Sequence, residues 1–358
     1  MKAWVLEDIN QFIFKDNYPM PKIKEDEVLV KVMATGICGS DIQRVYVTGA
    51  HKHPLIIGHE FAGKVIAVGK NVDPSWLEQK VGIFPLLPCK RCSSCQHKQY
   101  ELCQNYNYLG SRTNGGFAEY VAVPVWNLLR LPEQVTYEQA AMLEPMSVAV
   151  HAMRRISINK RDHIVVCGLG TIGLLLVMFL LEAGFQNVLV IGNKDIQKEK
   201  AIELGVFPEN YCDSRTEEVK TWILKQTNQN GCNVFFECVG KNETINQAID
   251  SMAMEGKICF VGNPYTDVIL DKQVYWKILR RQLNLTGTWN STFFGEVDPN
   301  RQNDDWHYVL SKLKQRTIFP EKIITHRYDI FNVQLGFEIM YNKIEDYIKL
   351  MMISGEFK

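Results

Sequence analysis

HIVVCGLGTIGLLLVMFLLEAGFQNVLVIGN, residues 163–193, carries the pattern that decides the fold. A short apolar run is followed by a glycine turn, a long apolar segment and a second short apolar run, which predicts strand, turn, buried helix and strand. Glycines in such a turn lack the side chains that would keep a pyrophosphate away from the backbone and the helix N-terminus. We therefore predict a dinucleotide-binding loop. Its candidate residues are Gly168, Gly170, Thr171, Ile172 and Gly173.

The end of the second strand predicts which dinucleotide is bound. An acidic residue at this point accepts hydrogen bonds from the adenosine ribose and repels a 2′-phosphate. The sequence instead has Gly192, Asn193 and Lys194, which remove the repulsion and add a cation. This favours NADP over NAD. The alternative is NAD, with the ribose bound by Asp195 or by a backbone group.

The same stretch raises a membrane span as an alternative. From Ile164 to Leu181 it contains eighteen consecutive uncharged residues. The glycines in its first half favour a strand, a turn and a buried helix instead. Near the N-terminus, Glu7 and Asp8 interrupt what would be the apolar core of a signal peptide. We therefore expect a cytoplasmic protein with no membrane partner.

The length of 358 residues predicts two domains. Residues 1–145 contain short apolar runs separated by glycine and proline, which is typical of a mainly antiparallel β domain. Residues 146–289 alternate buried strands with helical patterns, which predicts a doubly wound parallel sheet of the Rossmann type. Residues 290–358 end in a helix and a strand that we expect to rejoin the first domain. The predicted fold class is α/β with one β-rich domain.

Four of the ten cysteines form a C-x2-C-x2-C-x7-C run on one short segment. Four thiolates at this spacing can surround one zinc ion with no open position for a substrate, which predicts a structural site. Unrelated surface cysteines and an iron–sulfur cluster are the alternatives, although the run lacks the x3-C-P ending of such clusters. The residues of the run are Cys89, Cys92, Cys95 and Cys103.

Forty basic and forty acidic side chains cancel. Binding of nucleic acid or of an anionic membrane requires a basic surface, so neither partner is expected. The same balance argues against a nucleic-acid-binding zinc module built on the four cysteines. A small molecule is the expected partner.

Several motifs together resemble the zinc-dependent medium-chain alcohol and polyol dehydrogenases. They are GICGSD, IIGHEFAGKVIAVG, the four-cysteine segment, GGFAEYVAVP, EPMSVAVHA and GLGTIGL. The resemblance extends along essentially the whole chain and implies a GroES-like catalytic domain beside the Rossmann domain. It also implies a homo-dimer or homo-tetramer, because relatives often assemble through the cofactor domain.

The resemblance implies a catalytic zinc bound by Cys38 and His59. Glu60 and Glu144 match further family positions close to the metal, either as ligands or as partners that orient the ligands. Ser40 matches the hydroxyl that passes the alcohol proton toward solvent, with a turn-forming serine as the alternative. The chain would then hold two zinc ions. Presence of all four candidate ligands disfavours a non-catalytic binding protein.

PLLPCKRC, YLGSRTNGGFAEY and KILRRQLNLTGTWNS are most similar to the subgroup that acts on polyol phosphates such as galactitol 1-phosphate. The expected reaction is oxidation of a secondary alcohol to a ketone; sorbitol or L-iditol 2-dehydrogenases and threonine dehydrogenases are the alternatives. Arginine recognises phosphate by a bidentate fork, so Arg44 and Arg112 are candidate phosphate ligands. Arg112 has the alternative of bracing its own loop. Trp289 and Asn290 are candidates for the far wall of the substrate site.

Overall fold

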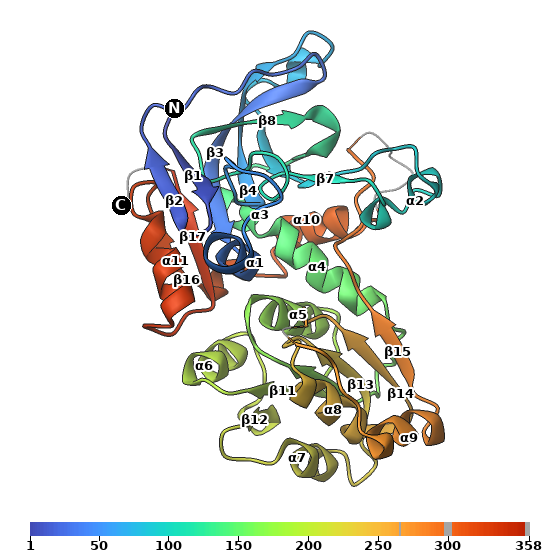
Figure 1. Ribbon diagram of the computed structural model, residues 1–358. Coiled ribbons are helices and arrows are strands. Elements are labelled where there is room, and N and C mark those ends of the chain that lie inside the picture. Colours follow the sequence, from blue (N-terminus) through green and yellow to red (C-terminus); the bar gives the residue numbers. More distant parts are fainter. Residues whose placement is uncertain (265, 297–302, 355–358) are drawn as a thin grey trace. The chain divides into compact units, whose positions relative to one another are not determined.

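The computed structural model describes residues 1–264, 266–296 and 303–354 and divides into two compact units. The first unit comprises Met1–Ser147 and Ser291–Lys358, and the second comprises Val148–Asn290. Figure 1 shows the elements of each unit. The assignment of catalysis to the first unit and of cofactor binding to the second stays a prediction.

The largest sheet of the first unit has seven strands among the described residues, in the order β16-β17-β3-β4-β5-β9, with β8 paired to β3. All neighbours in this sheet are antiparallel except β16 and β17. The β-rich fold predicted for this region is therefore confirmed. The strands are β3 (Glu27–Ile37), β4 (Glu60–Val68), β5 (Lys80–Ile83), β8 (Tyr120–Pro124), β9 (Leu128–Arg130), β16 (Ile324–Tyr328) and β17 (Lys349–Ile353).

The C-terminal segment returns to this sheet. Helix α11 (Val333–Asn342) precedes β17, and β17 pairs antiparallel with β3, with Leu350 opposite Ile37. Figure 1 shows the red C-terminal strand beside the blue strand β3. The C-terminal helix and strand thus lie on the sheet of the first unit.

Smaller elements complete the first unit. Phe61, Phe117 and Phe337 pack in its apolar core, so strand, loop and C-terminal helix share one interior. The additional strands are β1 (Ala3–Asp8), β2 (Gln11–Lys15), β6 (Leu86–Leu87) and β7 (Asn107–Tyr108). The helices that begin in this unit, besides α11, are α1 (Gly39–Gln43), α2 (Ser93–Gln96), α3 (Tyr137–Ala141), α4 (Leu143–Arg154) and α10 (Asp305–Gln315).

The second unit is built on a six-stranded sheet with the order β12-β11-β10-β13-β14-β15. Every neighbouring pair is parallel. This is the order of a doubly wound sheet, which binds ligands at the carboxyl ends of its strands where the order reverses. The strands are β10 (Ile164–Cys167), β11 (Val188–Gly192), β12 (Tyr211–Asp213), β13 (Cys232–Glu237), β14 (Met252–Phe260) and β15 (Asn284–Gly287). The helices are α5 (Thr171–Glu182), α6 (Asp195–Glu203), α7 (Val219–Gln226), α8 (Asn242–Ser251) and α9 (Lys272–Arg280).

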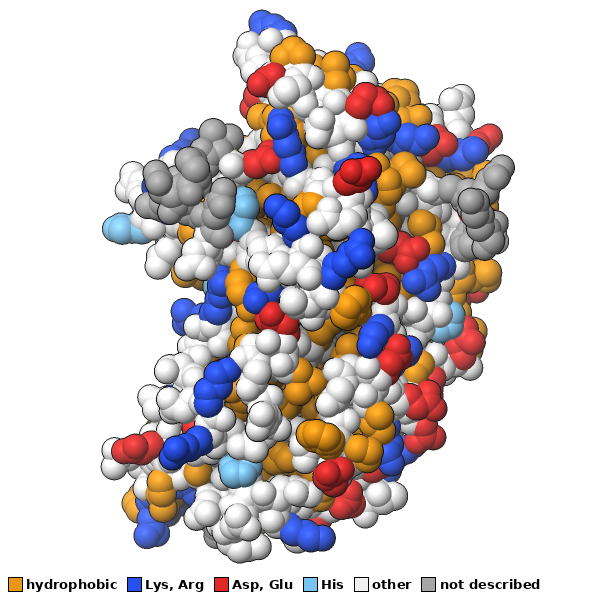
Figure 2. Space-filling view, turned by 180° about the vertical axis from the view of Figure 1, so that it is seen from behind, with side chains coloured by type: hydrophobic (Ala, Val, Ile, Leu, Met, Phe, Trp, Pro, Cys, Tyr) orange, Lys and Arg blue, Asp and Glu red, His pale blue; other side chains and the backbone are white. Residues whose placement is uncertain are grey.

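The uncharged stretch from Ile164 to Leu181 forms β10, the glycine turn and most of α5. Eight consecutive residues of α5, from Gly173 to Leu180, are buried, so its apolar character is used in packing. Within the described part of the chain, no helix combines the length and the apolar character needed to cross a membrane. Figure 2 shows basic and acidic side chains interspersed over one face of the molecule.

Candidate active site

The CGSD motif lies where β3 ends and α1 begins. Cys38 is the residue before α1, and its backbone N–H donates to Asp41 Oδ2 at 3.1 Å. Ser40 Oγ donates to Cys38 Sγ at 3.3 Å. An acid in the first turn of a helix satisfies N–H groups that have no partner within the helix. The local sequence therefore fixes the half-buried Cys38 thiol next to the Ser40 hydroxyl.

The GHE motif reaches the same place through strand pairing. Antiparallel pairing of β3 with β4 sets Glu60 opposite Gly36, two residues before Cys38. The ligand atoms of Cys38, His59 and Glu60 all lie within 4.8 Å of one another. A thiolate, an imidazole and a carboxylate are donors that zinc accepts, and three protein donors leave a position open for a substrate. The donor set therefore fits a catalytic zinc.

Asp41 adds a negative charge beside His59. Its buried carboxylate lies 3.3 Å from His59 Nδ1 without hydrogen-bond geometry. Although burial acts in the opposite direction, Asp41 and Cys38 raise the pKa of His59 well above its usual value. Asp41 and Cys38 thus place negative charge beside His59, which favours a bound cation. Metal-binding histidines commonly use their second ring nitrogen on a carboxylate, which is the place that Asp41 holds.

A lysine from the far end of the chain holds Glu60. Lys349 Nζ contacts Glu60 Oε2 and donates to Ile37 O at 3.0 Å. Both charged side chains are almost fully buried, at 2% and 3% exposed. A Cβ on Gly36 would come within 2.2 Å of Glu60 Oε2, so glycine gives this pair its room. Glu60 therefore has a counter-charge before any metal is bound.

Glu144 lies near this cluster, but its carboxylate is hydrogen-bonded to Tyr108. It lies in the first turn of α4, and its Oε1 accepts a hydrogen bond from Tyr108 Oη at 3.0 Å. Burial raises the pKa of Glu144 to about 7, against the charge of His59, which acts to lower it. Its oxygens are not part of the group of three that lies within 4.8 Å. Its role as a zinc ligand stays a prediction.

The four-cysteine run forms a second candidate metal site, in which all four sulfur atoms lie within 4.8 Å of one another. Backbone N–H groups of Cys95 and Gln104 lower the pKa of Cys92 to about 6, whereas burial raises the pKa of Cys95 to about 12. Backbone N–H donors to sulfur stabilise the thiolate form that zinc binds. All ten cysteines are free, and Cys167, Cys212, Cys232 and Cys259 are buried whereas Cys238 is half-buried.

Each glycine of the predicted dinucleotide loop has a physical reason to lack a side chain. Gly168 has φ +95°, and a Cβ on Gly173 would lie 1.9 Å from Gly168 O. A Cβ on Gly170, which caps α5, would meet no atom within 4 Å. The first and third glycines therefore allow the tight turn, and the second leaves open space at the helix N-terminus. This cradle fits a pyrophosphate.

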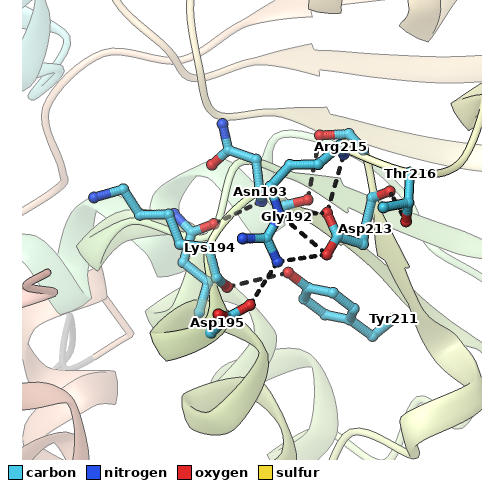
Figure 3. A network of polar contacts seen from close by, with 10 residues as sticks. Gly192, Asn193, Lys194, Asp195, Tyr211, Asp213, Arg215 and Thr216 are labelled. Carbon is cyan, nitrogen blue, oxygen red and sulfur yellow. Dashed lines mark hydrogen bonds and ion pairs between the residues drawn. The ribbon is translucent and has the colours of Figure 1, made fainter.

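Figure 3 shows the polar contacts at the end of β11. Asn193 N donates to Gln197 Oε1 at 3.0 Å, and Tyr211 Oη donates to Lys194 O at 3.3 Å. Lys194 is the residue before α6. The three residues that replace the expected acid are thus held in one turn between β11 and α6.

The candidate phosphate ligands have protein partners of their own. Arg44 Nη1 donates to Ser40 Oγ at 2.9 Å and to Asp41 Oδ1 at 3.1 Å. Arg112 donates to Tyr106 O at 3.1 Å and lies 4.2 Å over the Tyr106 ring, which supports the loop-bracing alternative. Burial and the charges of Arg112 and Arg44 lower the pKa of His51, so these cations share one region of positive potential.

The two residues predicted for the far wall belong to the end of the second unit. Trp289 is half exposed, and Asn290 has a left-handed backbone with φ +53°. Their assignment to a substrate wall stays a prediction.

Three residues of the first-unit site were missed by the sequence reasoning. Asp41 stands in the quoted CGSD motif, so its position gave a usable signal, whereas Tyr108 and Lys349 gave none. All three contact candidate ligands of the catalytic zinc.

Comparisons with known proteins define the class. The alcohol dehydrogenase GroES-like domain matches residues 24–133, and the zinc-binding dehydrogenase domain matches residues 171–313. The chain belongs to the zinc-dependent medium-chain alcohol and polyol dehydrogenases, which are NAD(P)-dependent enzymes. The predicted family, fold class and enzyme type are therefore confirmed.

Individual members of this class are similar to the chain over most of its length. Galactitol 1-phosphate 5-dehydrogenase of Escherichia coli strain K12 is 31% identical over 90% of this chain and 92% of its own. The crystal structure of galactitol-1-phosphate dehydrogenase from Escherichia coli has a TM-score of 0.89 at 27% identity and covers 99% of this chain and 100% of the other. Sorbitol dehydrogenase of Bacillus subtilis strain 168 is 32% identical over 74% of this chain and 75% of its own.

One further solved structure bears on the cofactor. A protein described as a zinc-binding dehydrogenase, from Sinorhizobium meliloti 1021, was solved bound to NADP. It has a TM-score of 0.89 at 25% identity, and the match covers 99% of each chain. Relatives with different substrates lie at similar identity, so the comparisons establish an alcohol or polyol dehydrogenase without selecting the substrate.

Proposed function

We propose that this protein oxidises a secondary alcohol of a polyol phosphate, galactitol 1-phosphate or a close analogue, to the ketone, with hydride transfer to NADP. The observation that carries the proposal is the group formed by half-buried Cys38 with buried His59 and Glu60, whose ligand atoms lie within 4.8 Å of one another. Sorbitol dehydrogenase activity is the alternative, and the substrate experiment below separates the two.

Cys38, His59 and Glu60 would hold a catalytic zinc, and Glu144 is the second carboxylate proposed near it. When bound, zinc acts as a Lewis acid that lowers the pKa of the substrate hydroxyl. The four-cysteine site would hold a second, structural zinc, so we propose two zinc ions per chain.

Proton transfer falls to Ser40 in this proposal. Its hydroxyl contacts Cys38 Sγ and accepts a hydrogen bond from Arg44 Nη1. A hydroxyl both donates and accepts, so Ser40 Oγ can take the alcohol proton from the substrate while passing its own proton to solvent, which the half-buried Ser40 reaches. The substrate carbon that bears the hydroxyl gives its hydride to the nicotinamide, and the alcohol becomes a carbonyl.

The phosphate of the substrate would be bound by Arg44 and Arg112. The charges of both arginines lower the pKa of His51, which supports a region of positive potential within the first unit. Arg44 contacts Asp41 and Ser40, so it joins the phosphate site to the proposed zinc ligands. Trp289 and Asn290 remain the proposed far wall.

We expect galactitol 1-phosphate to have a higher kcat/KM than galactitol or sorbitol, because arginine forms charge-assisted hydrogen bonds to phosphate. Arg44→Ala and Arg112→Ala should each lower the value for the phosphate ester by about 10- to 100-fold, corresponding to 1.5–3 kcal/mol. Steady-state kinetics on the three substrates measure this. The unphosphorylated polyols, whose values should change less, are the control. Equal efficiency with and without the phosphate would instead favour a sorbitol dehydrogenase.

The cofactor proposal is NADP, bound at its 2′-phosphate by the turn of Gly192, Asn193 and Lys194. We expect Gly192→Asp to weaken NADP relative to NAD by about 1–3 kcal/mol, because the new carboxylate repels the 2′-phosphate. A Cβ here would lie 2.7 Å from Tyr211 Oη, so Gly192→Ala is the steric control. The ratio of kcat/KM for the two cofactors measures the effect. An unchanged ratio in Gly192→Asp would exclude this turn as the reading site.

We further propose a homo-dimer, or a homo-tetramer built from it, joined through β15. This strand ends the described sheet, and an edge strand presents unpaired backbone N–H and C=O groups. Leu285 on β15 and Trp276 and Leu279 on α9 are exposed apolar side chains of the same unit. A two-fold axis would pair β15 with its copy. Light scattering of the purified protein measures the assembly.

The cytoplasmic location expected from the sequence is part of the same proposal.

A further inference from the structure

Strand β11 does not end in an acidic residue, but the neighbouring strand β12 does. Parallel pairing sets Asp213, the last residue of β12, beside Gly192, the last residue of β11. Ser214, the next residue, ties the two strand ends together through its backbone N–H, which donates to Gly192 O at 3.0 Å. A carboxylate thus borders the turn that we assign to the cofactor ribose.

Arg215 covers this carboxylate. Its Nε lies 2.9 Å from Asp213 Oδ1 and 3.1 Å from Oδ2, and its Nη2 lies 2.6 Å from Oδ2. The same Nη2 donates to Asp195 Oδ1 at 2.5 Å. Figure 3 shows the guanidinium folded between the two carboxylates, close to Gly192 and Asn193. One arginine therefore bridges two acids from different elements, the N-terminus of α6 and the end of β12.

The charges decide what this bridge does. Hydrogen bonds from Arg215 lower the pKa of Asp213 to about 2, so this group is anionic throughout the neutral range. The side chain of Asp195 is 78% exposed, so solvent and solutes can reach it. Without Arg215, two carboxylates would face the turn and repel a phosphate. Among the described residues, Arg215 Nη1 has no protein acceptor, so this nitrogen can donate to an anion.

We propose that Arg215 determines selectivity for the 2′-phosphate of the cofactor, by masking Asp213 and Asp195 and by donating to the phosphate from Nη1. The inference rests on the proposed NADP site and adds a residue to it. It explains how a turn bordered by two acids accepts a further anion.

Arg215 is 46% exposed, and exposed ion pairs usually contribute little to stability. A purely structural clamp and a selectivity device therefore predict different results. The clamp predicts that both cofactors lose affinity together. The selectivity device predicts that NADPH alone loses affinity and that removal of the uncovered acid restores part of it.

The experiment is fluorescence titration of the purified, zinc-loaded chain with NADPH and with NADH, without substrate. We expect Arg215→Ala to raise the Kd for NADPH at least about tenfold and to leave the Kd for NADH within about twofold. Arg215→Ala/Asp213→Asn should recover at least about threefold of the NADPH affinity, because one repelling charge is removed. Unchanged NADPH binding, equal weakening of both cofactors, or no recovery in the double variant overturns the proposal.

Controls separate this proposal from the NADP assignment on which it rests. Arg161→Ala removes another exposed arginine of the same unit, from the loop before β10, and should change neither Kd. Thermal melting of each variant reports on its folding. If Lys194→Ala weakens NADPH but Arg215→Ala does not, only the Arg215 proposal fails. If the wild type binds NADH at least about tenfold more tightly than NADPH, the NADP assignment fails and this proposal with it.

Discussion

Cys38→Ser is expected to abolish turnover while the protein keeps its fold and the zinc of its four-cysteine site. The serine hydroxyl is a far poorer zinc ligand than a thiolate, and Cys38 is one of three donors within 4.8 Å of one another. We expect kcat/KM to fall by more than the 10- to 100-fold that is typical when a partner of a zinc ligand is lost. Zinc content per chain, thermal melting and steady-state kinetics measure the three parts of this prediction.

Cys92→Ser is the matched variant, because it makes the same chemical change at the other site. Its thiol is one of the four that surround the proposed structural ion. A structural zinc contributes directly to folding, so this variant should lose one zinc and melt at a lower temperature. If Cys38→Ser keeps normal turnover, or if both variants lose the same zinc, the assignment of two distinct sites is wrong.

Local sequence patterns predicted the parts of the site that depend on neighbouring residues. The glycine turn and the four-cysteine run each lie within about one turn or loop, and spacing alone brings their atoms together. The role of Cys38 at the end of β3 was instead implied by the family resemblance. A doubly wound parallel sheet, and the return of a C-terminal helix and strand to the first domain, were also expected from strand and helix patterns. The pairing of Gly36 with Glu60 was not predicted, although β3 and β4 are consecutive antiparallel strands.

Contacts between distant parts of the chain were not predictable in this way. Lys349 is a single lysine ahead of the apolar run LMMI, and its partner Glu60 lies 289 residues earlier. Only the register of β17 on β3 carries its Nζ to Glu60, and no local pattern encodes that register. Arg215 likewise follows a short strand in a polar segment, where an arginine is ordinarily solvated. Asp213 becomes visible as a substitute acid only once β12 is paired with β11.

The buried pair of Lys349 and Glu60 gives the second large prediction. Removing one member of a buried ion pair leaves the other charge uncompensated, which costs about 3–5 kcal/mol. We expect Lys349→Met to destabilise the chelator-treated protein by this amount relative to wild type treated in the same way. For a unit of this size the melting temperature should fall by about 10 °C. Thermal and urea unfolding of both proteins measure the difference.

Zinc makes the prediction sharper, because a metal bound by Glu60 would supply a second counter-charge. The loss in Lys349→Met should therefore be smaller in the zinc-loaded protein than in the chelated one. Lys349→Met/Glu60→Gln should recover most of the lost stability in both, since the uncompensated charge is gone. Lys314→Met, at an exposed lysine of the same unit, should stay within about 0.5 kcal/mol of wild type. Equal destabilisation with and without zinc would show that Glu60 does not reach the metal and serves only as the partner of Lys349.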